Sequence, residues 1–287
     1  MSQHLSSKSP LYRLRRLILR SIPIVLLLAG AAFILLPFVW MVSLSLKPED
    51  EIFSPVIHLL PSTPEWSNYV VAMTQTDVPR YLLNGLIVVG GILFFQIAFA
   101  VPCSYALAQR NFRAKPVLFA MVLGGLLVPF QVTAIPVFLG LAKVQLLNTY
   151  WSLILPFMPT AFGLFLFRQA ISQLPSELFA AARVDGMSET EIVWRIAFPL
   201  VLPAATAFAI FSVTAHWNDL FWPMIATSDP QLATPPRGIL YFRDQEAGNQ
   251  VGPLMAATVI ITAPLVVAFL IAQRKFTQGL ATAGLKG

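Results

Sequence analysis

The side chains that could take part in chemistry are few in this 287-residue chain. Trp217, Asn218 and Asp219 follow one another at the end of an apolar run, and Gln131 and Tyr105 each stand among apolar neighbours. Polar groups in such surroundings are costly unless they face a cavity, a partner or one another. We therefore take these five residues as candidates for a solute path or gate. Helix capping, an interfacial position, a subunit contact or a bond between helices remains the alternative for each.

Enzymatic chemistry finds little support in the sequence. Cys103 is the single cysteine, and the three histidines (His4, His58 and His216) are too far apart in sequence to suggest a metal site. The chain contains no phosphate-binding loop, nucleophile elbow or cluster of metal-ligand residues. We expect no catalytic residue, no metal and no cofactor, and we do not expect this chain to hydrolyse ATP by itself.

The composition indicates an integral membrane protein. Hydrophobic residues make up 57% of the chain and charged residues only 11%, whereas an average soluble domain carries about 25% charged residues. The mean hydropathy is +0.73. So few charges cannot coat a water-soluble fold, and they are bunched between long uncharged runs.

Six uncharged stretches are candidate membrane spans, because about 20 apolar residues are needed for a helix to cross the hydrocarbon core. Lipid cannot satisfy an open backbone, so we expect helices and an all-α polytopic fold with six transmembrane helices. The first stretch is longer than a signal peptide core and lacks a small-residue cleavage site, so we expect it to be retained. The stretches are Ile22–Leu46, Tyr81–Ala108, Pro116–Ala142, Trp151–Phe167, Pro199–Asn218 and Val251–Ala272.

The distribution of charge predicts the orientation. With the N-terminus inside, the inner segments hold 14 Lys and Arg against 4 acids, and the outer segments hold 5 against 9. This satisfies the positive-inside rule, so both termini are expected in the cytoplasm. It also explains the net charge of +6 through lipid headgroups rather than nucleic acid, which we do not expect as a partner. The predicted parts are a tail (1–21), a membrane domain (22–272) with an inner loop (168–198), and a second tail (273–287).

The first long outer segment, Lys47–Arg80, contains five prolines and cannot span the membrane. We expect a surface loop with a short interfacial helix near Trp66–Met73. A second outer segment, Phe221–Gln250, is also polar and rich in proline.

The inner loop between the fourth and fifth spans is much longer than a plain connection. Pro175 and Ser176 resemble a helix start with Ser176 as N-cap, and Gly186 after Asp185 is a typical helix stop. A second helical run is expected from Ser188, itself a plausible N-cap, towards the fifth span. The alanines within the first helix would give it a narrow, smooth face suited to docking in the groove of another protein.

The same loop resembles the EAA motif of the inner-membrane permease subunits of bacterial ABC importers. The matching segments are Ala180–Gly186 and, nine residues further on, Ile196–Pro199. In that family the loop forms a coupling helix, between helices four and five, that fits a cleft in the cytoplasmic ATPase subunit. The motif's glutamate is replaced by Ala180 and its last leucine by Phe198, so Glu177, one turn earlier, is the candidate to replace the glutamate. The resemblance implies these ATPase-coupling residues: Glu177, Ala180, Ala181, Ala182, Asp185, Gly186 and Met187.

Further segments extend the resemblance over nearly the whole chain. They are similar to the second permease of maltose-type carbohydrate importers. The resemblance implies a sugar or related carbohydrate as solute, delivered by a periplasmic binding protein across the bacterial inner membrane. It also implies a cytoplasmic ATPase dimer and a second, homologous permease that completes a heterodimer within the lipid. Which carbohydrate is transported is left open. The matches are Ser45–Pro48, Glu51–Phe53, Asn68-Tyr69, Trp217–Asp219, Trp222-Pro223, Leu254–Ala257 and the tail from Gln273.

The main alternative is a secondary transporter or channel that works without an ATPase. Such a protein would be expected to carry charged relay residues or broken helices inside its spans, and the six stretches contain almost none. A membrane enzyme is less favoured, because no acid, base and nucleophile are clustered.

Overall fold

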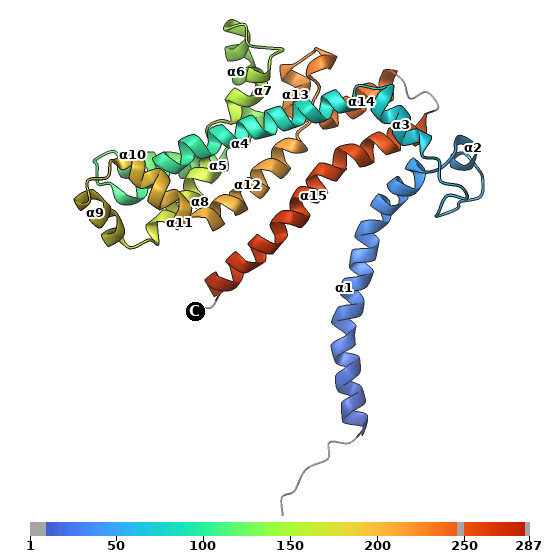
Figure 1. Ribbon diagram of the computed structural model, residues 1–287, viewed down its shortest axis with the longest axis horizontal. Coiled ribbons are helices and arrows are strands. Elements are labelled where there is room, and N and C mark those ends of the chain that lie inside the picture. Colours follow the sequence, from blue (N-terminus) through green and yellow to red (C-terminus); the bar gives the residue numbers. More distant parts are fainter. Residues whose placement is uncertain (1–9, 246–249, 285–287) are drawn as a thin grey trace, which may run out of the picture.

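The computed structural model describes the backbone of residues 10–245 and 250–284, and the side chains of residues 21–242 and 250–271. Within these residues the chain forms helices and loops but no strands, as the sequence predicts for a chain in lipid. Figure 1 shows α4 and α15 crossing the body, and α1 extending away from it except at its C-terminal end, which contacts α15.

The helices succeed one another in this order. The α-helices are α1 (Pro10–Ser45), α2 (Glu49–Ile52), α3 (Ser67–Thr74), α4 (Val78–Gln109), α5 (Lys115–Leu127), α6 (Phe130–Lys143), α7 (Tyr150–Ile154), α8 (Ala161–Ser172), α9 (Ser176–Val184), α10 (Glu189–Glu191), α11 (Phe198–Leu200), α12 (Leu202–Trp217), α13 (Phe221–Ala226), α14 (Pro235–Gln245) and α15 (Val251–Gly284). Three further segments are the 3₁₀ turns η1 (Leu155–Phe157) and η3 (Pro230–Leu232) and the π-helical segment η2 (Ile192–Ala197).

Among the residues that the structure describes, three helices are by themselves long and apolar enough to cross a membrane. They are the Ser21–Ser45 part of α1, all of α4, and the Val251–Ile271 part of α15. They correspond to the first, second and sixth spans that hydropathy predicts. The chain is therefore a polytopic, all-α membrane protein.

The other three predicted spans are each broken into two helices, which corrects the expectation of continuous segments. The pair α5 and α6 bends by 103°, Tyr150–Phe157 meets α8 at 45°, and Glu189–Leu200 meets α12 at 79°. Up to six spans result if each bent pair is one span. The sequence disfavours a secondary transporter partly because the six stretches look unbroken. The broken helices remove that reason.

Proline accounts for the positions of the breaks. Pro129 adopts an extended conformation (φ −66°, ψ 138°) between α5 and α6, and Pro156 and Pro159 lie between α7 and α8. Proline has no N–H to donate and disfavours helical geometry at the preceding residue. Hydropathy alone does not register this effect, so apolar runs that contain such prolines look continuous.

The third break has a different form, because the bend lies at Val201 between Pro199 and Pro203. Val201 takes φ −99° and ψ 12°, outside the α-helical range, and it is buried in the core. The predicted helical run from Ser188 towards Pro199 is confirmed, but its middle part is π-helical.

Side chains of α4 satisfy backbone groups at these irregular places. The Gln96 amide donates to the carbonyl of Phe157 over 2.9 Å, and the Ser104 hydroxyl donates to the carbonyl of Leu164 over 2.9 Å. Both side chains of α4 are buried. An unpaired carbonyl in a lipid-enclosed protein costs several kcal/mol, so the bond from Gln96 stabilises the break between α7 and α8, while the bond from Ser104 ties α4 to α8 itself.

The side chain of Trp222 satisfies a backbone carbonyl of α7. Its indole N–H donates to the carbonyl of Ser152 over 2.8 Å, and the side chain is fully buried. In a regular helix that carbonyl would accept from residue 156, which is a proline and has no N–H.

The outer segment contains the short helix that the sequence predicts, since α3 spans Ser67–Thr74. The Asn68 amide donates to the carbonyls of Ser45 and Lys47, which fixes α3 to the end of α1. The Tyr69 and Ser45 hydroxyls lie 2.7 Å apart and share a hydrogen bond.

Two helical glycines offer a matched test of this packing. A Cβ at Gly238 of α14 would overlap the ring of Tyr81 on α4, whereas a Cβ at Gly90 of α4 would meet nothing within 4 Å. We expect Gly238→Ala to destabilise the fold by about 1–3 kcal/mol through overpacking. Gly90→Ala should be neutral or stabilise by up to about 1 kcal/mol. The measurement is the thermal unfolding midpoint of the purified protein in detergent, and equal shifts for the two variants would contradict the packing.

Candidate functional site

Helix α9 is positioned by the loop features that the sequence contains. Pro175, extended at φ −57° and ψ 130°, is the N-cap, and no side chain caps the helix. The expectation of Ser176 as N-cap is therefore wrong, and Ser176 is instead the first helical residue. The predicted stop is confirmed: Asp185 caps α9, and Gly186 takes φ +82°, a conformation that favours glycine.

One face of α9 packs on the membrane helices. Phe179 is fully buried and Ala182 is 4% exposed, in the same cluster as Phe167 and Ile171 of α8. The Phe179 ring also meets the Tyr105 ring of α4 edge to face, with centroids 5.4 Å apart. The predicted coupling residue Ala182 therefore faces this chain's own core and is not available on the outer surface.

The other face of α9 is open. Glu177, Ala180 and Ala181 are exposed, and the apolar side chain of Val184 is 87% exposed. Residues three and four apart share a helix face, so Glu177 lies beside the two alanines. Asp185 and Gly186 are also exposed at the end of the helix, while Met187 is half-buried against the core.

The turn after Gly186 is held by a capping box, which confirms the prediction for Ser188. The Ser188 hydroxyl accepts from the backbone N–H of Glu191, and the Glu191 carboxylate accepts from the backbone N–H of Ser188 over 3.1 Å. That backbone hydrogen bond lowers the pKa of Glu191 below its ordinary value. Arg195 pairs with the same carboxylate at 3.2 Å, one turn along the chain.

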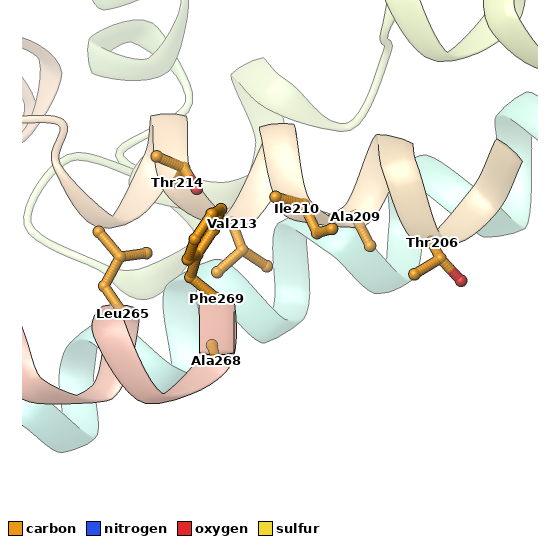
Figure 2. A pocket seen from close by; sticks show the side chains of 8 residues that line it. All are labelled: Thr206, Ala209, Ile210, Val213, Thr214, Leu265, Ala268 and Phe269. Atoms are coloured by element: carbon orange, nitrogen blue, oxygen red, sulfur yellow. The ribbon is translucent and has the colours of Figure 1, made fainter. Parts of the chain in front are cut away.

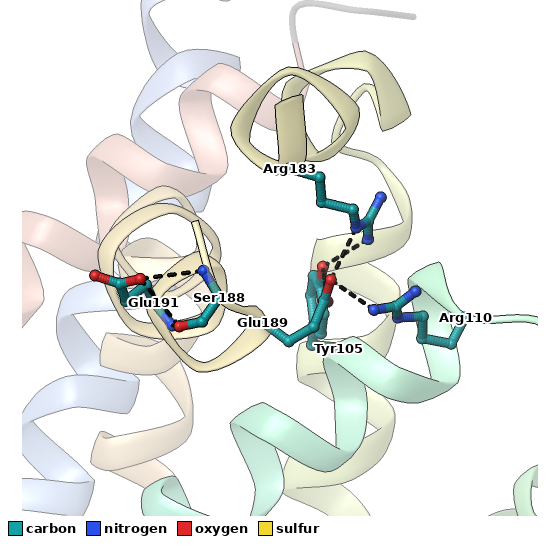
Figure 3. Close-up of polar contacts among 6 residues, drawn as sticks. All are labelled: Tyr105, Arg110, Arg183, Ser188, Glu189 and Glu191. Carbon is teal, nitrogen blue, oxygen red and sulfur yellow. Dashed lines mark hydrogen bonds and ion pairs between the residues drawn. The ribbon is translucent and has the colours of Figure 1, made fainter. Parts of the chain in front are cut away.

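A polar cluster joins α9 and α10 to the C-terminal end of α4 (Figure 3). Glu189 lies at its centre: its Oε2 accepts from the Tyr105 hydroxyl over 2.9 Å, and its Oε1 accepts from Arg183 Nε over 2.9 Å. Arg183 Nη2 in turn donates to the Tyr105 hydroxyl over 3.0 Å, which closes a ring of three bonds. Arg110 Nη2, just after α4, lies 2.5 Å from Glu189 Oε1.

The cluster favours the charged form of its carboxylate. The hydrogen bond from Arg183 is the largest cause that lowers the pKa of Glu189, and the Tyr105 hydrogen bond and the nearby charge of Arg110 lower it further. The hydrogen bond to Glu189 in turn raises the pKa of Arg183. The sequence prediction placed Tyr105 on a solute path; in the structure its hydroxyl bonds Glu189 and Arg183, next to α9.

The residues Trp217, Asn218 and Asp219 make local structural contacts. The buried Trp217 donates its indole N–H to the carbonyl of Ile261 on α15 over 3.2 Å. The exposed Asn218 amide donates back to its own helix, and Asp219 Oδ1 accepts from the backbone N–H of Trp222 at the start of α13. These bonds match the capping and packing alternative.

Gln131 is exposed near the start of α6, next to Phe130, whose ring lies 5.3 Å from the ring of Trp222. In the described contacts the five predicted path residues do not form one hydrogen-bonded cluster. His216 lies next to the buried Gln96 of α4, with 3.4 Å between His216 Nε2 and Gln96 Nε2.

Several grooves between the helices are apolar. Figure 2 shows one of about 200 Å³ between α12 and α15, lined by apolar side chains with the hydroxyls of Thr206 and Thr214 at its margin. The Thr206 hydroxyl already donates to the carbonyl of Leu202. Such a groove suits an acyl chain or another helix better than a polyhydroxylated solute, which needs convergent polar groups. A pocket of about 250 Å³ with polar lining lies between Lys47, Glu49, Asn68 and the start of α15.

Sequence reasoning missed Arg110, Arg183 and Glu189. Arg183 and Glu189 flank the turn at Gly186, which is a local signal that they can approach each other. Their meeting with Tyr105, 78 and 84 residues away along the chain, depends on the packing of α9 against α4 and has no local signal.

Comparison with known proteins identifies the class. Residues 100–282 match the family described as binding-protein-dependent transport system inner membrane component. The matched region contains α9, α10 and their partners on α4. The chain belongs to this family, and it is a multi-pass protein of the bacterial inner membrane.

Two curated relatives cover nearly the whole chain. The arabinooligosaccharides transport system permease protein AraQ of Halalkalibacterium halodurans is 32% identical over 91% of this chain and 96% of its own length. The sn-glycerol-3-phosphate transport system permease protein UgpE of Yersinia pestis is 31% identical over 89% of this chain and 94% of its own.

The fold is also found in a solved structure. A chain of a bacterial ABC transporter involved in the import of the acidic polysaccharide alginate aligns with a TM-score of 0.80 and 21% identity, over 94% of this chain and 99% of that one.

The lowered pKa of Glu189 predicts an acid-sensitive contribution to stability. Because the folded state favours the carboxylate, the contribution is complete above the ordinary pKa of 4.5 and is lost as the pH falls through the lower folded value. The unfolding midpoint of the wild type should therefore exceed that of Glu189→Gln at neutral pH, and the difference should shrink below pH 4.5. A difference that grows on acidification would contradict this account.

Proposed function

We propose that this chain is the permease subunit through which an ATP-driven importer moves a carbohydrate or related polyol across the bacterial inner membrane. The observation that carries the proposal is the two-faced helix α9, buried on the permease through Phe179 and open through Ala180, Ala181 and Val184, in a chain of the binding-protein-dependent transport family. A helix built in this way presents an unpartnered face to a second protein.

The names of the relatives support a polyhydroxylated solute. AraQ belongs to a system for arabinooligosaccharides, UgpE to one for sn-glycerol-3-phosphate, and NgcG of Streptomyces coelicolor, 28% identical, to one for diacetylchitobiose. These solutes share hydroxyl-rich backbones and differ in size and charge, so the proposal extends to the class and not to one sugar.

The partner at α9 is a cytoplasmic ATPase dimer. The coupling surface consists of Ala180 and Ala181 with Glu177, Asp185 and Gly186. Glu177 replaces the missing motif glutamate, because it is exposed one turn before Ala180 on the same side of the helix. Transport requires that ATP binds preferentially to the state in which the coupling helices are drawn together, since equal affinity for both states would shift nothing.

The proposed permease function also implies an orientation of the chain in the membrane. Residues 1–21 and 273–287 lie in the cytoplasm, and residues 22–272 form the membrane domain with six spans, the fifth of which starts after residue 198. Residues 168–198 are then cytoplasmic, although α8 runs on to Ser172 and shortens the free loop at that end. The excess of Lys and Arg on this side supports the orientation.

A second, homologous permease and a periplasmic binding protein complete the importer, with lipid around the outer helices. The apolar grooves of this chain do not offer a polar chamber by themselves, so the solute path forms between two permeases. A structure related by fold at 17% identity and a TM-score of 0.59 contains the alginate transporter in complex with alginate pentasaccharide-bound periplasmic protein. In such a path Asn218 and Gln131 keep exposed amides for solute contact.

An ATPase-independent transporter or channel is the second candidate. The three broken spans favour it, because discontinuous helices build substrate sites in many secondary transporters. Membership of the binding-protein-dependent family and the open face of α9 favour the importer instead.

Substitutions on α9 test the proposed docking. Ala181→Arg places a long cation on the coupling surface, and Gly186→Val forces a β-branched residue into φ +82°. We expect the amount of ATPase that co-purifies with tagged permease from cells expressing the whole operon to fall about tenfold, equivalent to about 1.4 kcal/mol of binding. Membrane insertion should be unchanged.

Gln173→Arg is the matched control, because Gln173 is exposed in the same loop but lies before α9. It should retain the ATPase. Normal recovery of ATPase with Ala181→Arg and Gly186→Val would contradict docking at α9.

A further inference from the structure

Two routes connect α9 to the membrane helices. Along the chain, α10 continues through the π-helical segment η2 and then bends by 79° at Val201 before α12 begins. The π-helix is a rare geometry that is frequently found at functional sites. A force applied to α9 therefore meets a bend before it reaches α12.

The route through space is more direct. Tyr105 of α4 bonds both Arg183 of α9 and Glu189 of α10, and Phe179 packs against the same tyrosine ring. At the adjacent end of α4, the Gln109 amide donates to the carbonyl of Ile171 on α8 over 3.2 Å. The inner end of α4 is thus tied to the elements on both sides of the loop.

The ring of bonds fixes orientation as well as distance. Both carboxylate oxygens of Glu189 are engaged, one by the Tyr105 hydroxyl and one by the two arginines Arg183 and Arg110. A rotation of α9 relative to α4 would break at least one of these bonds. Side chains at the ion pairs are 35% to 46% exposed, and such pairs contribute about 0–1 kcal/mol to stability. Their value is therefore in positioning rather than in holding the fold together.

We propose that Tyr105, Arg110, Arg183 and Glu189 form a clamp that makes α4 move together with α9 and α10 as one body, while η2 and the bend at Val201 act as a hinge towards α12. Movement imposed on α9 then enters the membrane through α4. Tyr105 and Glu189 are positioning residues in this scheme, since neither lies on the outer face of α9. The inference rests on the proposed function, because it requires a partner that moves α9.

Distances between spin labels can separate the two routes. The complete transporter, with its co-purified ATPase, is placed in lipid nanodiscs in a Cys103→Ala background, because Cys103 is exposed and would also be labelled. One pair joins Thr190 of α10 to Leu86 of α4, and the other joins Thr190 to Phe211 of α12; all three sites are exposed. Distances are measured without nucleotide and with ATP and Mg²⁺.

In the otherwise unmodified protein, ATP should leave the α10–α4 distance unchanged and shift the α10–α12 distance. With Tyr105→Phe or Glu189→Gln, the α10–α4 distance should broaden and become ATP-dependent. The double variant should behave like either single variant, because both remove the same ring of bonds.

Glu191→Gln is the matched control, since Glu191 bonds only to Ser188 and Arg195 of its own segment in the described contacts. It should behave as the parent protein. The clamp would be overturned by an ATP-dependent α10–α4 distance in the parent, or by an unchanged distance in the Tyr105→Phe and Glu189→Gln variants.

A failure of the proposed function has a different signature. In that case no ATPase co-purifies and neither distance responds to ATP, which would overturn the importer assignment and the clamp together. An α10–α12 distance that responds to ATP, combined with an α10–α4 distance indifferent to the variants, would overturn the clamp alone.

Discussion

The structure depends on one constraint, which is that lipid offers no hydrogen bonds to an open backbone. Prolines break three of the predicted spans, and each break must be satisfied by other parts of the protein. Gln96 and Ser104 of α4 bond carbonyls along η1 and α8, and Trp222 bonds the carbonyl of Ser152 that Pro156 cannot reach. As a result α4 becomes a helix against which bent segments are arranged.

The same helix extends this arrangement to the loop that contains α9 and α10. Tyr105 near the C-terminal end of α4, and Arg110 just after it, continue the series of polar contacts and bond Glu189 and Arg183 of the loop. A long helix that is bonded to η1, α8, α9 and α10 can pass a displacement at one end to the others. If the loop couples to an ATPase as proposed, this is a physical reason for it to be fastened to α4 rather than to the helix that follows it in sequence.

The sequence predicted the class of fold and the two-helix loop well, because both have local causes. Hydropathy marks the apolar stretches, and the stop at Gly186 and the capping box at Ser188 are encoded within a few residues. The bends were missed, since an apolar count treats proline like its neighbours. The role of the candidate path residues could not be read from the sequence, because single residues such as Trp217 and Asp219 carry no information on whether they face a partner or cap a helix. The Tyr105 cluster could not be foreseen, as its members meet only through tertiary packing.

The most direct test of the account is a photo-crosslink from the coupling surface. A benzophenone amino acid at Ala181, which is exposed on α9, would be activated in intact membranes of cells that express the whole operon, and the products identified by mass spectrometry. The account predicts an adduct with a protein that contains a phosphate-binding loop, and none from the same probe at the exposed Leu202 of α12. Adducts from Ala181 with lipid alone, or with no ATPase, would contradict it.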